Sequence, residues 1–298
     1  MTAAATIARY AAYPLILGGS AVGVTVLAAR MPLPWAMSVV NVAAGLAIIA
    51  AELALPYRRR WRESRGDVKT DLAYLALTGV ALLVAAAPLM SACAAAALWL
   101  GERTGGGIWP RHWPGAVQLA LALLVYELGS YVLHRASHHT WLWRLHSVHH
   151  SVRRLHGLNA IRSHPIDFFL SVVAISGPLL LLGVDPLVFA QLTVLGTVNM
   201  WLQHTNADMK TGWLDWLFVT PHIHRWHHSQ VVGEQQRNLG AILIVWDIVF
   251  GTRLAPPDRA PPEDVGTGHE LAGAAYPDTF LAQLAAPFQR ALWKAAAG

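Results

Sequence analysis

The chain alternates between long apolar stretches and short polar segments. A helix needs about 20 apolar residues to cross a bilayer. Four stretches reach that length, and they run over Tyr10–Ala29, Trp35–Pro56, Leu72–Leu100 and Pro114–Leu133. The third is long enough to tilt, or to kink at Pro88, because proline has no N–H to donate inside a helix. The pattern therefore predicts four transmembrane helices.

Two shorter apolar stretches follow, Asp167–Gly183 and Pro186–Gln203, broken by the turn "GVDP". The pair is short for two complete spans. It predicts a helical hairpin that either crosses the membrane or dips partway into it. The expected fold class is thus all-α: an integral membrane helical bundle with about four full spans and a short hairpin.

Composition supports this membrane assignment. Hydrophobic residues make up 55% of the 298 residues and charged residues only 13%, whereas a soluble domain carries about 25% charged residues. The formal net charge of +5 is therefore better explained by loop topology than by nucleic-acid binding, and no nucleic-acid partner is expected. The single cysteine, Cys93, excludes an intramolecular disulfide and a thiolate metal cluster.

The distribution of lysine and arginine predicts the orientation. The loop Tyr57–Thr70, "YRRRWRESRGDVKT", is strongly basic, while Met31–Pro34 and Gly101–Trp113 carry far fewer cations. Short basic loops stay on the cytoplasmic side, so this loop and the N-terminus are expected in the cytoplasm. The ends of the fourth and sixth stretches then face the same side. Binding of anionic lipid is an alternative explanation for the arginines.

Three histidine-rich boxes lie at this predicted cytoplasmic end: "HRASH", "HSVHH" and "HRWHH". Helical positions three and four apart share a face, with side chains that start about 5–6 Å apart. The boxes supply eight histidines: His134, His138, His146, His149, His150, His224, His227 and His228. Eight ligands exceed the four of a tetrahedral zinc site, so they predict two metal ions about 3.5–4 Å apart. Imidazole suits iron, zinc, copper and nickel, so the metal's identity stays open here.

Other histidines lie near the same plane. His164, in "RSHP", and His204, in "QHTN", stand at the ends of apolar stretches, where each either completes the metal site or plays an orienting or capping role. Three further histidines are expected to be peripheral: His139, His156 and His222. His112 is expected on the opposite side and His269 in the tail, so both are left out of the site.

Carboxylate and amide groups are expected to orient the ligating imidazoles by accepting their other ring N–H. Glu127 lies two helical turns before His134 on the same face, in an apolar span where a carboxylate is costly unless paired or functional. Asp167 and Asn206 are further candidates of this kind. Asn159 and Asp247 are weaker ones.

These motifs, in this order, resemble the fatty acid hydroxylase/sterol desaturase superfamily of membrane enzymes. The resemblance runs from about Tyr126 to Thr252 and rests on "LHRASH", "WRLHSVHHS", "IRSHP", "LQHTN", "VTPHIHRWHHS" and "LIVWDIVFGT". It implies a di-iron enzyme in which the eight box histidines bind the metals, joined by His164 and His204. Together with the apolar stretches and the Pro/Gly-rich segment after Arg253, it predicts three regions: N-terminal transmembrane helices over 1–113, a fatty acid hydroxylase-like catalytic domain over 114–252, and over 253–298 a C-terminal loop in which "FLAQLAAPFQRALW" is a candidate amphipathic helix.

The resemblance further implies the chemistry. Members use O₂ and two electrons to hydroxylate or desaturate a C–H bond of a lipid, so a fatty acyl, sterol or related isoprenoid substrate is expected to enter from the bilayer. The expected cofactors are two iron ions, with zinc as a substitute after purification. Because no cytochrome b5-like segment is visible in the sequence, electrons are expected from a separate ferredoxin- or cytochrome b5-like donor with its reductase.

Two other classes of function remain to be weighed. A histidine-rich membrane protein for metal transport or storage, without redox chemistry, is the alternative reading. A transporter needs polar or ionisable groups along a path through its spans, and these spans have few apart from Glu52 and Glu127. A membrane metallohydrolase is disfavoured because the sequence contains no HExxH motif.

Overall fold

The structure, a computed structural model, describes residues 2–64, 66–104, 107–267 and 275–293. It is nearly all helical. Across these residues no strand is formed, and the β pairing consists of isolated bridges such as the one between Pro56 and Ala207. The predicted all-α fold is confirmed.

Among the described residues, four helices are long and apolar enough to cross a membrane: α1 (Ala3–Ala28), α2 (Leu33–Ala54), the continuous helix Asp67–Arg103, and α5 (Gly115–His139). Large apolar side chains are exposed along their outer faces, among them Leu15, Val22, Leu46 and Leu83. Exposed apolar surface on this scale is rare in soluble monomers, and lipid tails are its natural cover. The chain is an integral membrane protein.

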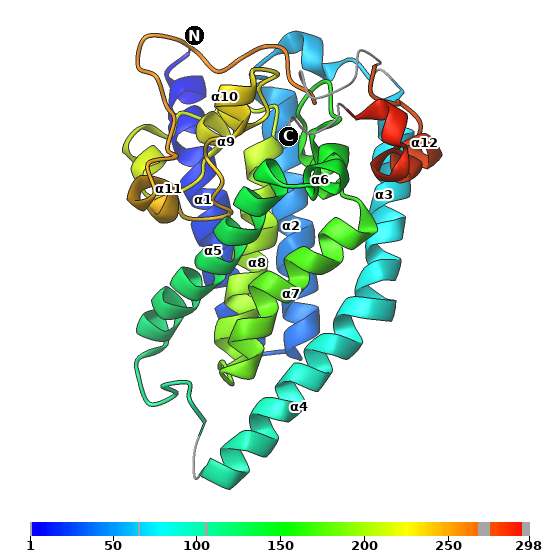
Figure 1. The fold of residues 1–298 in the computed structure, drawn as a ribbon. Coiled ribbons are helices and arrows are strands. Elements are labelled where there is room, and N and C mark those ends of the chain that lie inside the picture. The colour runs from blue at the N-terminus through cyan, green and yellow to red at the C-terminus, as the bar shows by residue number, and fades with distance from the viewer. Residues whose placement is uncertain (1, 65, 105–106, 268–274, 294–298) are drawn as a thin grey trace.

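The helix Asp67–Arg103 contains the irregularity expected near Pro88. It consists of α3 (Asp67–Ala81), a π-helical turn (Leu82–Ala86) and α4 (Ala87–Thr104). Pro88 has no N–H, and its ring crowds the carbonyl one turn earlier. The wider π turn directly before it relieves this conflict. Figure 1 shows α3 and α4 following each other along the outer edge of the bundle.

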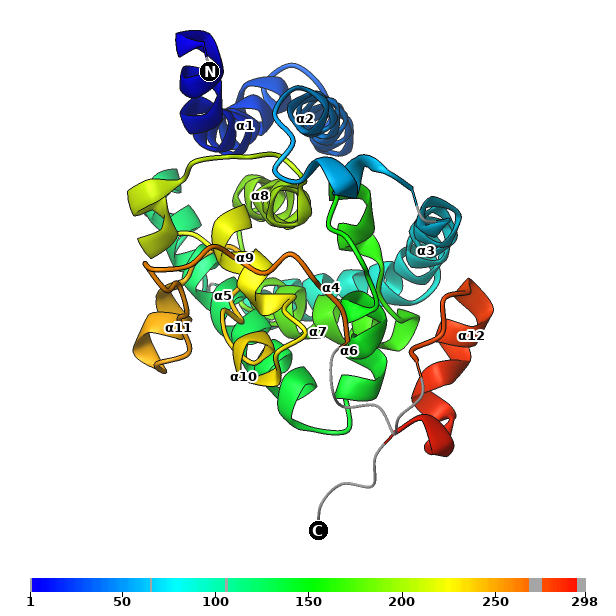
Figure 2. The ribbon, with the colours of Figure 1, turned by 90° about the horizontal axis from the view of Figure 1, so that it is seen from above.

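The predicted hairpin is formed by α7 (Pro165–Leu181) and α8 (Pro186–His204). Asp185 caps α8 by accepting the Leu187 N–H at 2.9 Å, with proline at the first helical position. Helix α8 contacts α1, α2 and α5 and lies between them in the view from above (Figure 2). Its Asn199 accepts a 2.8 Å hydrogen bond from the Tyr13 hydroxyl. The second half of the hairpin is thus the core of the bundle.

Short helices gather at the end where the N-terminus lies (Figure 1). They are α6 (Trp143–His150), α9 (Pro221–His227), α10 (Val232–Gln235), α11 (Val245–Val249) and α12 (Phe280–Ala285). In the described part of the tail, 275–293, the chain forms the short α12 and two 3₁₀ turns. Pro287 lies in the first of these turns, and Trp293 belongs to the same buried cluster as Trp143 of α6. The described part of the tail therefore packs against α6 at the histidine-rich end of the molecule.

We expect Gly129→Ala to destabilise the bundle by separating α5 from α7. A Cβ at Gly129 would lie 2.2 Å from the backbone oxygen of Ala174, and overpacking of this kind costs about 1–3 kcal/mol. Thermal unfolding in detergent should therefore begin several degrees lower. Gly177→Ala is the matched control, because a Cβ there meets nothing within 4 Å. Equal unfolding midpoints for the two variants would contradict this packing.

Candidate metal centre

Nine histidines of the described chain converge from α5, α6, α8 and the α9 region. They form two groups in which the candidate ligand atoms all lie within 4.8 Å of one another. The first group is His134, His138, His146, His150 and His227. The second group is His149, His204, His224 and His228. The structure thus brings together all eight box histidines and His204.

Each HxxHH box divides between the two groups. On α6, His146 and His150 belong to the first group and His149 to the second. At α9 the assignment is reversed, since His227 belongs to the first group while the other two histidines of that box belong to the second. Positions i and i+4 lie one turn apart on a face, and position i+3 lies to one side. The two boxes therefore contribute to both groups at once.

The Nε2 atoms of the imidazoles face one another. Nε2 of His134 lies 3.1 Å from that of His146 in the first group. The three Nε2 atoms of His204, His224 and His228 lie 3.0–3.2 Å apart in the second group. Three more Nε2 atoms are buried without a hydrogen-bond partner, those of His138, His150 and His227. Buried polar atoms are rarely left unpartnered, so these convergent nitrogens fit metal ions between them.

Backbone carbonyls orient several rings from the opposite nitrogen. Nδ1 of His134 lies 2.8 Å from the Leu239 oxygen, and Nδ1 of His227 lies 2.9 Å from the Arg237 oxygen. Because a carbonyl only accepts, Nδ1 carries the proton and Nε2 keeps its lone pair for the centre of the group. This is the arrangement by which outer contacts fix the tautomer of a metal-binding histidine.

Burial keeps these rings neutral. Loss of hydration, together with the neighbouring His146, lowers the pKa of His149 to about 3. The same desolvation, with nearby imidazoles, holds the pKa of His227 and His228 well below the usual range. Neutral imidazole is the form that binds a metal ion. The site is therefore prepared for cations without first losing protons.

His164 is not brought into either group. Its Nδ1 accepts the Ile166 N–H at 3.2 Å and so caps α7, while its ring meets Phe288 at a centroid distance of 5.9 Å. The sequence left a metal-ligand role and a capping role open for His164. The structure shows the capping role. Of the peripheral histidines, His222 binds Asp215 at 2.8 Å, His139 is exposed, and His156 lies beside Asp67 and Asp71. His269 lies outside the described residues.

The three orienting candidates differ in what they contact. Asp167 accepts from Nδ1 of His146 at 3.0 Å, as expected of an orienting carboxylate. Asn206 instead binds the backbone of Arg58. Its Oδ1 accepts the Arg58 N–H at 2.9 Å, and its Nδ2 donates to the Arg58 oxygen at 3.0 Å. Glu127 is fully buried and accepts the backbone N–H groups of residues 241, 242 and 243. It therefore holds a loop rather than a histidine.

Two side chains contact rings of these groups although the sequence gives little or no signal for them. Asn159, only a weaker candidate from the sequence, has its Oδ1 3.1 Å from Nδ1 of His204. The amide of Gln235 lies 3.2 Å from Nδ1 of His150. Gln235 lies seven residues beyond the third box in a short polar stretch. Nothing in its local pattern distinguishes it from Gln236, so sequence reasoning missed it.

Fold and site together define an integral membrane protein with a buried, all-imidazole centre that could hold two metal ions. The fatty acid hydroxylase family model matches residues 119–252. The chain is 39% identical to the ornithine lipid hydroxylase OlsE of Rhizobium tropici over 249 residues, which are 82% of this chain and 73% of that protein. The chain belongs to the fatty acid hydroxylase family and is an oxidoreductase.

Two further relatives match a smaller part of this chain. The alkylglycerol monooxygenase of Danio rerio is 34% identical over 148 residues, 49% of this chain and 33% of that protein. The methylsterol monooxygenase 1 of Rattus norvegicus is 26% identical over 139 residues, 43% of this chain and 44% of that protein. The chain thus spans a third to under a half of these two relatives. No solved structure matches it significantly.

Proposed function

We propose that this chain is a membrane-bound di-iron oxygenase that uses O₂ and two electrons to hydroxylate a C–H bond of a lipid. The observation that carries the proposal is the division of nine imidazoles, all buried or half-buried, into two groups. Membership of a family whose named relatives are hydroxylases and monooxygenases supports it. Two adjacent groups with four or five nitrogens each suit a metal pair.

In this proposal the first group holds one iron ion and the second group holds the other. Bound iron would supply the redox chemistry that activates O₂ toward an unactivated C–H bond. The protein's own contribution is to present neutral nitrogens, to fix their tautomers through Nδ1, and to keep water away from the centre. Imidazole ligands also suit an oxidising site, since thiolates are readily oxidised there. Zinc is the expected substitute after purification.

The two carboxylates of the spans argue against metal transport as the alternative. Glu127 is engaged by three backbone N–H groups. Glu52 accepts from the N–H groups of Gly157 and Asn206 and from the Thr205 hydroxyl, at 2.8, 2.9 and 3.1 Å. Both carboxylates therefore hold loops in place. A transport path needs ionisable groups that are free to bind the passing cation.

The substrate class we propose is an amino-acid-containing membrane lipid of the ornithine lipid type. The similarity to OlsE, which extends over 82% of the chain, supports this choice over ether lipids and sterols. The substrate would reach the centre from the bilayer between the spans. Electrons would come from a separate ferredoxin- or cytochrome b5-like protein with its reductase.

We also propose that the metal centre and the N-terminus face the cytoplasm. The N-terminus and the histidine-bearing helices lie at the same end of the molecule (Figure 1), as the basic loop 57–70 predicts for the cytoplasmic side. Residues 114–252 would form the catalytic region, because all nine converging histidines fall within them. Residues 1–113 would add membrane helices, and 253–298 a tail over the centre.

Comparative lipid analysis tests the proposal. The full chain would be expressed with a compatible donor in a host that makes ornithine lipids, beside a His149→Ala/His227→Ala variant. We expect a lipid species heavier by one oxygen atom that only the intact chain produces. A product lighter by two hydrogens would assign desaturation instead. Identical lipid profiles, with both proteins inserted and the intact chain loaded with iron, would contradict an oxygenase.

A further inference from the structure

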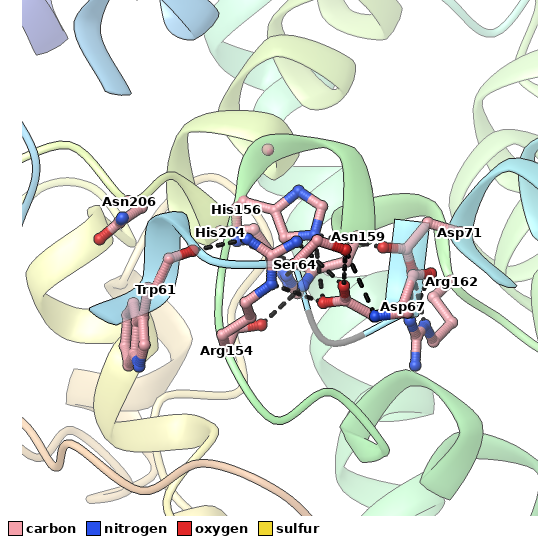
Figure 3. Close-up of polar contacts among 12 residues, drawn as sticks. Trp61, Ser64, Asp67, Asp71, Arg154, His156, Asn159, Arg162, His204 and Asn206 are labelled. Carbon is pink, nitrogen blue, oxygen red and sulfur yellow. Dashed lines mark hydrogen bonds and ion pairs between the residues drawn. The ribbon is translucent and has the colours of Figure 1, made fainter. Parts of the chain in front are cut away.

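Two largely buried ion pairs join α3 to the loop between α6 and α7 (Figure 3). Arg154 donates to both oxygens of Asp67, at 2.6 and 3.0 Å. Arg162 donates from Nε to Asp71 at 2.7 Å and again from Nη2. The Asp71 side chain is fully buried and that of Arg162 is 4% exposed. Charge-assisted, forked contacts of this kind fix geometry closely.

This cluster is an ion-pair network rather than a further cation site. Ligand atoms of Asp67, Asp71 and His156 do lie within 4.8 Å of one another. However, each carboxylate already receives two N–H bonds from a guanidinium. Two buried positive groups at the same place oppose a bound cation. The network must therefore serve another purpose.

Arg162 connects the network to His149. Its guanidinium is bound to α3 through Asp71, while its backbone oxygen lies 3.2 Å from Nδ1 of His149. Because the carbonyl can only accept, it keeps the proton on Nδ1 and the lone pair on Nε2. The position of this carbonyl depends on where the Arg162 side chain is anchored.

Asn159 connects the same loop to His204 (Figure 3). Its Nδ2 donates to the backbone oxygen of Arg154 at 2.7 Å, so its Oδ1 is the end that faces Nδ1 of His204, at 3.1 Å. Asn159 lies in the 3₁₀ turn Gly157–Ile161, and Arg154 is the residue bound to Asp67. A second imidazole is thus oriented by a loop that α3 holds in place.

Different residues orient the imidazole rings of the two histidine groups. In the second group the other two rings, His224 and His228, have buried Nδ1 atoms without a hydrogen-bond partner. Orientation through Nδ1 in that group therefore comes from the α3-bound loop. In the first group, Nδ1 contacts go to the Leu239 and Arg237 carbonyls, to Asp167 and to Gln235. None of these four partners belongs to the network of ion pairs described above.

We propose that Asp71, Arg162 and Asn159 are positioning residues for the second metal ion alone, acting through His149 and His204. This inference rests on the proposed function, since it requires two ions in the two groups. It gives α3 a role in the metal centre although α3 contributes no ligand to either group. It predicts that breaking the network weakens one ion selectively and leaves the other bound.

A zinc titration of the metal-free, detergent-solubilised full chain tests this, with a chromophoric chelator as competitor. We expect Asp71→Asn and Asn159→Ala to weaken one of two zinc equivalents by about 10–100-fold, the usual effect of losing an orienting contact. Asp71→Asn leaves the buried Arg162 without its carboxylate. The neutral double variant Asp71→Leu/Arg162→Met is therefore measured beside it.

Two kinds of control show whether the loss of affinity is specific to the second ion. Asp208→Asn breaks a partly buried ion pair with Arg9, 3.1 Å long, and should leave both equivalents unchanged. In a His224→Ala background, which already lacks a ligand of the second group, Asp71→Asn should add no further loss. His227→Ala removes a ligand of the first group, so the zinc ion that still binds lies in the second group. In that background Asp71→Asn should weaken the binding of this ion.

The outcomes separate the inference from the proposed function. A wild-type chain that binds fewer than two equivalents contradicts the proposed metal pair itself. Two equivalents in the wild type and in the folded double variant, with unchanged affinities, would overturn the inference alone. Equal loss of both equivalents would overturn it as well, because the network would then support the whole fold rather than one ion.

Discussion

Replacing either His149 or His227 by alanine should abolish lipid oxidation and remove about one metal ion from each purified chain. His227 belongs to the first group and His149 to the second, so the two variants probe the two ions separately. Each ring is oriented through Nδ1 by a backbone carbonyl, and alanine leaves that carbonyl without its donor. Because the lost rings are neutral, no buried charge is stranded, and the protein should still insert.

The control for these variants is His139→Ala. His139 follows the first box directly, but it is exposed at the end of α5 and belongs to neither group. It should keep both metal ions and full activity. Metal content by mass spectrometry and product formation are measured on the same preparations. Full activity in the His149 or the His227 variant would show that the ring is no ligand.

Glu127→Ala should be among the most destabilising single substitutions in the chain, costing about 3 kcal/mol or more. Its carboxylate accepts three backbone N–H groups, from Ala241, Ile242 and Leu243. Each buried donor left without an acceptor costs about 1–3 kcal/mol. The same segment contains Leu239, whose oxygen orients His134. Loss of the carboxylate should therefore lower metal affinity as well as stability.

Thermal unfolding and zinc affinity of Glu127→Ala check this expectation. The thermal stability of Glu127→Gln should lie between those of Glu127→Ala and the wild type. The amide retains one acceptor oxygen but places an NH₂ group against N–H donors. Glu102→Ala, on the exposed surface of α4, should unfold like the wild type. A Glu127→Ala protein as stable as the Glu102→Ala control would mean that the buried carboxylate does not hold the loop.

Sequence reasoning succeeded where a local pattern is tied to a strong physical constraint. Twenty-residue apolar stretches predicted the spans, because a bilayer demands that length. The spacing of the histidine boxes gave the eight rings, because helical periodicity fixes which side chains share a face. His204 was suggested by its place at the end of an apolar stretch. The same argument applied equally to His164, which caps α7 instead.

The parts that sequence could not supply depend on tertiary contacts. Asn159 and Asn206 look alike in sequence, but only the 3₁₀ turn at 157–161 brings Asn159 to His204. The partners of Glu127 lie more than 110 positions away. Carbonyls such as that of Arg162 have no side-chain signature at all. The division of each HxxHH box between two groups likewise appears only when α6 and α9 face each other.

The central claim is that this centre transfers oxygen from O₂ to a lipid, and the most direct measurement uses isotopically labelled gas. Cells expressing the full chain would be grown under oxygen-18 gas in ordinary water, and the hydroxylated lipid analysed by mass spectrometry. We expect a product that carries one oxygen-18 atom and is missing from the His149→Ala/His227→Ala control. A product carrying only ordinary oxygen, derived from water, would contradict it.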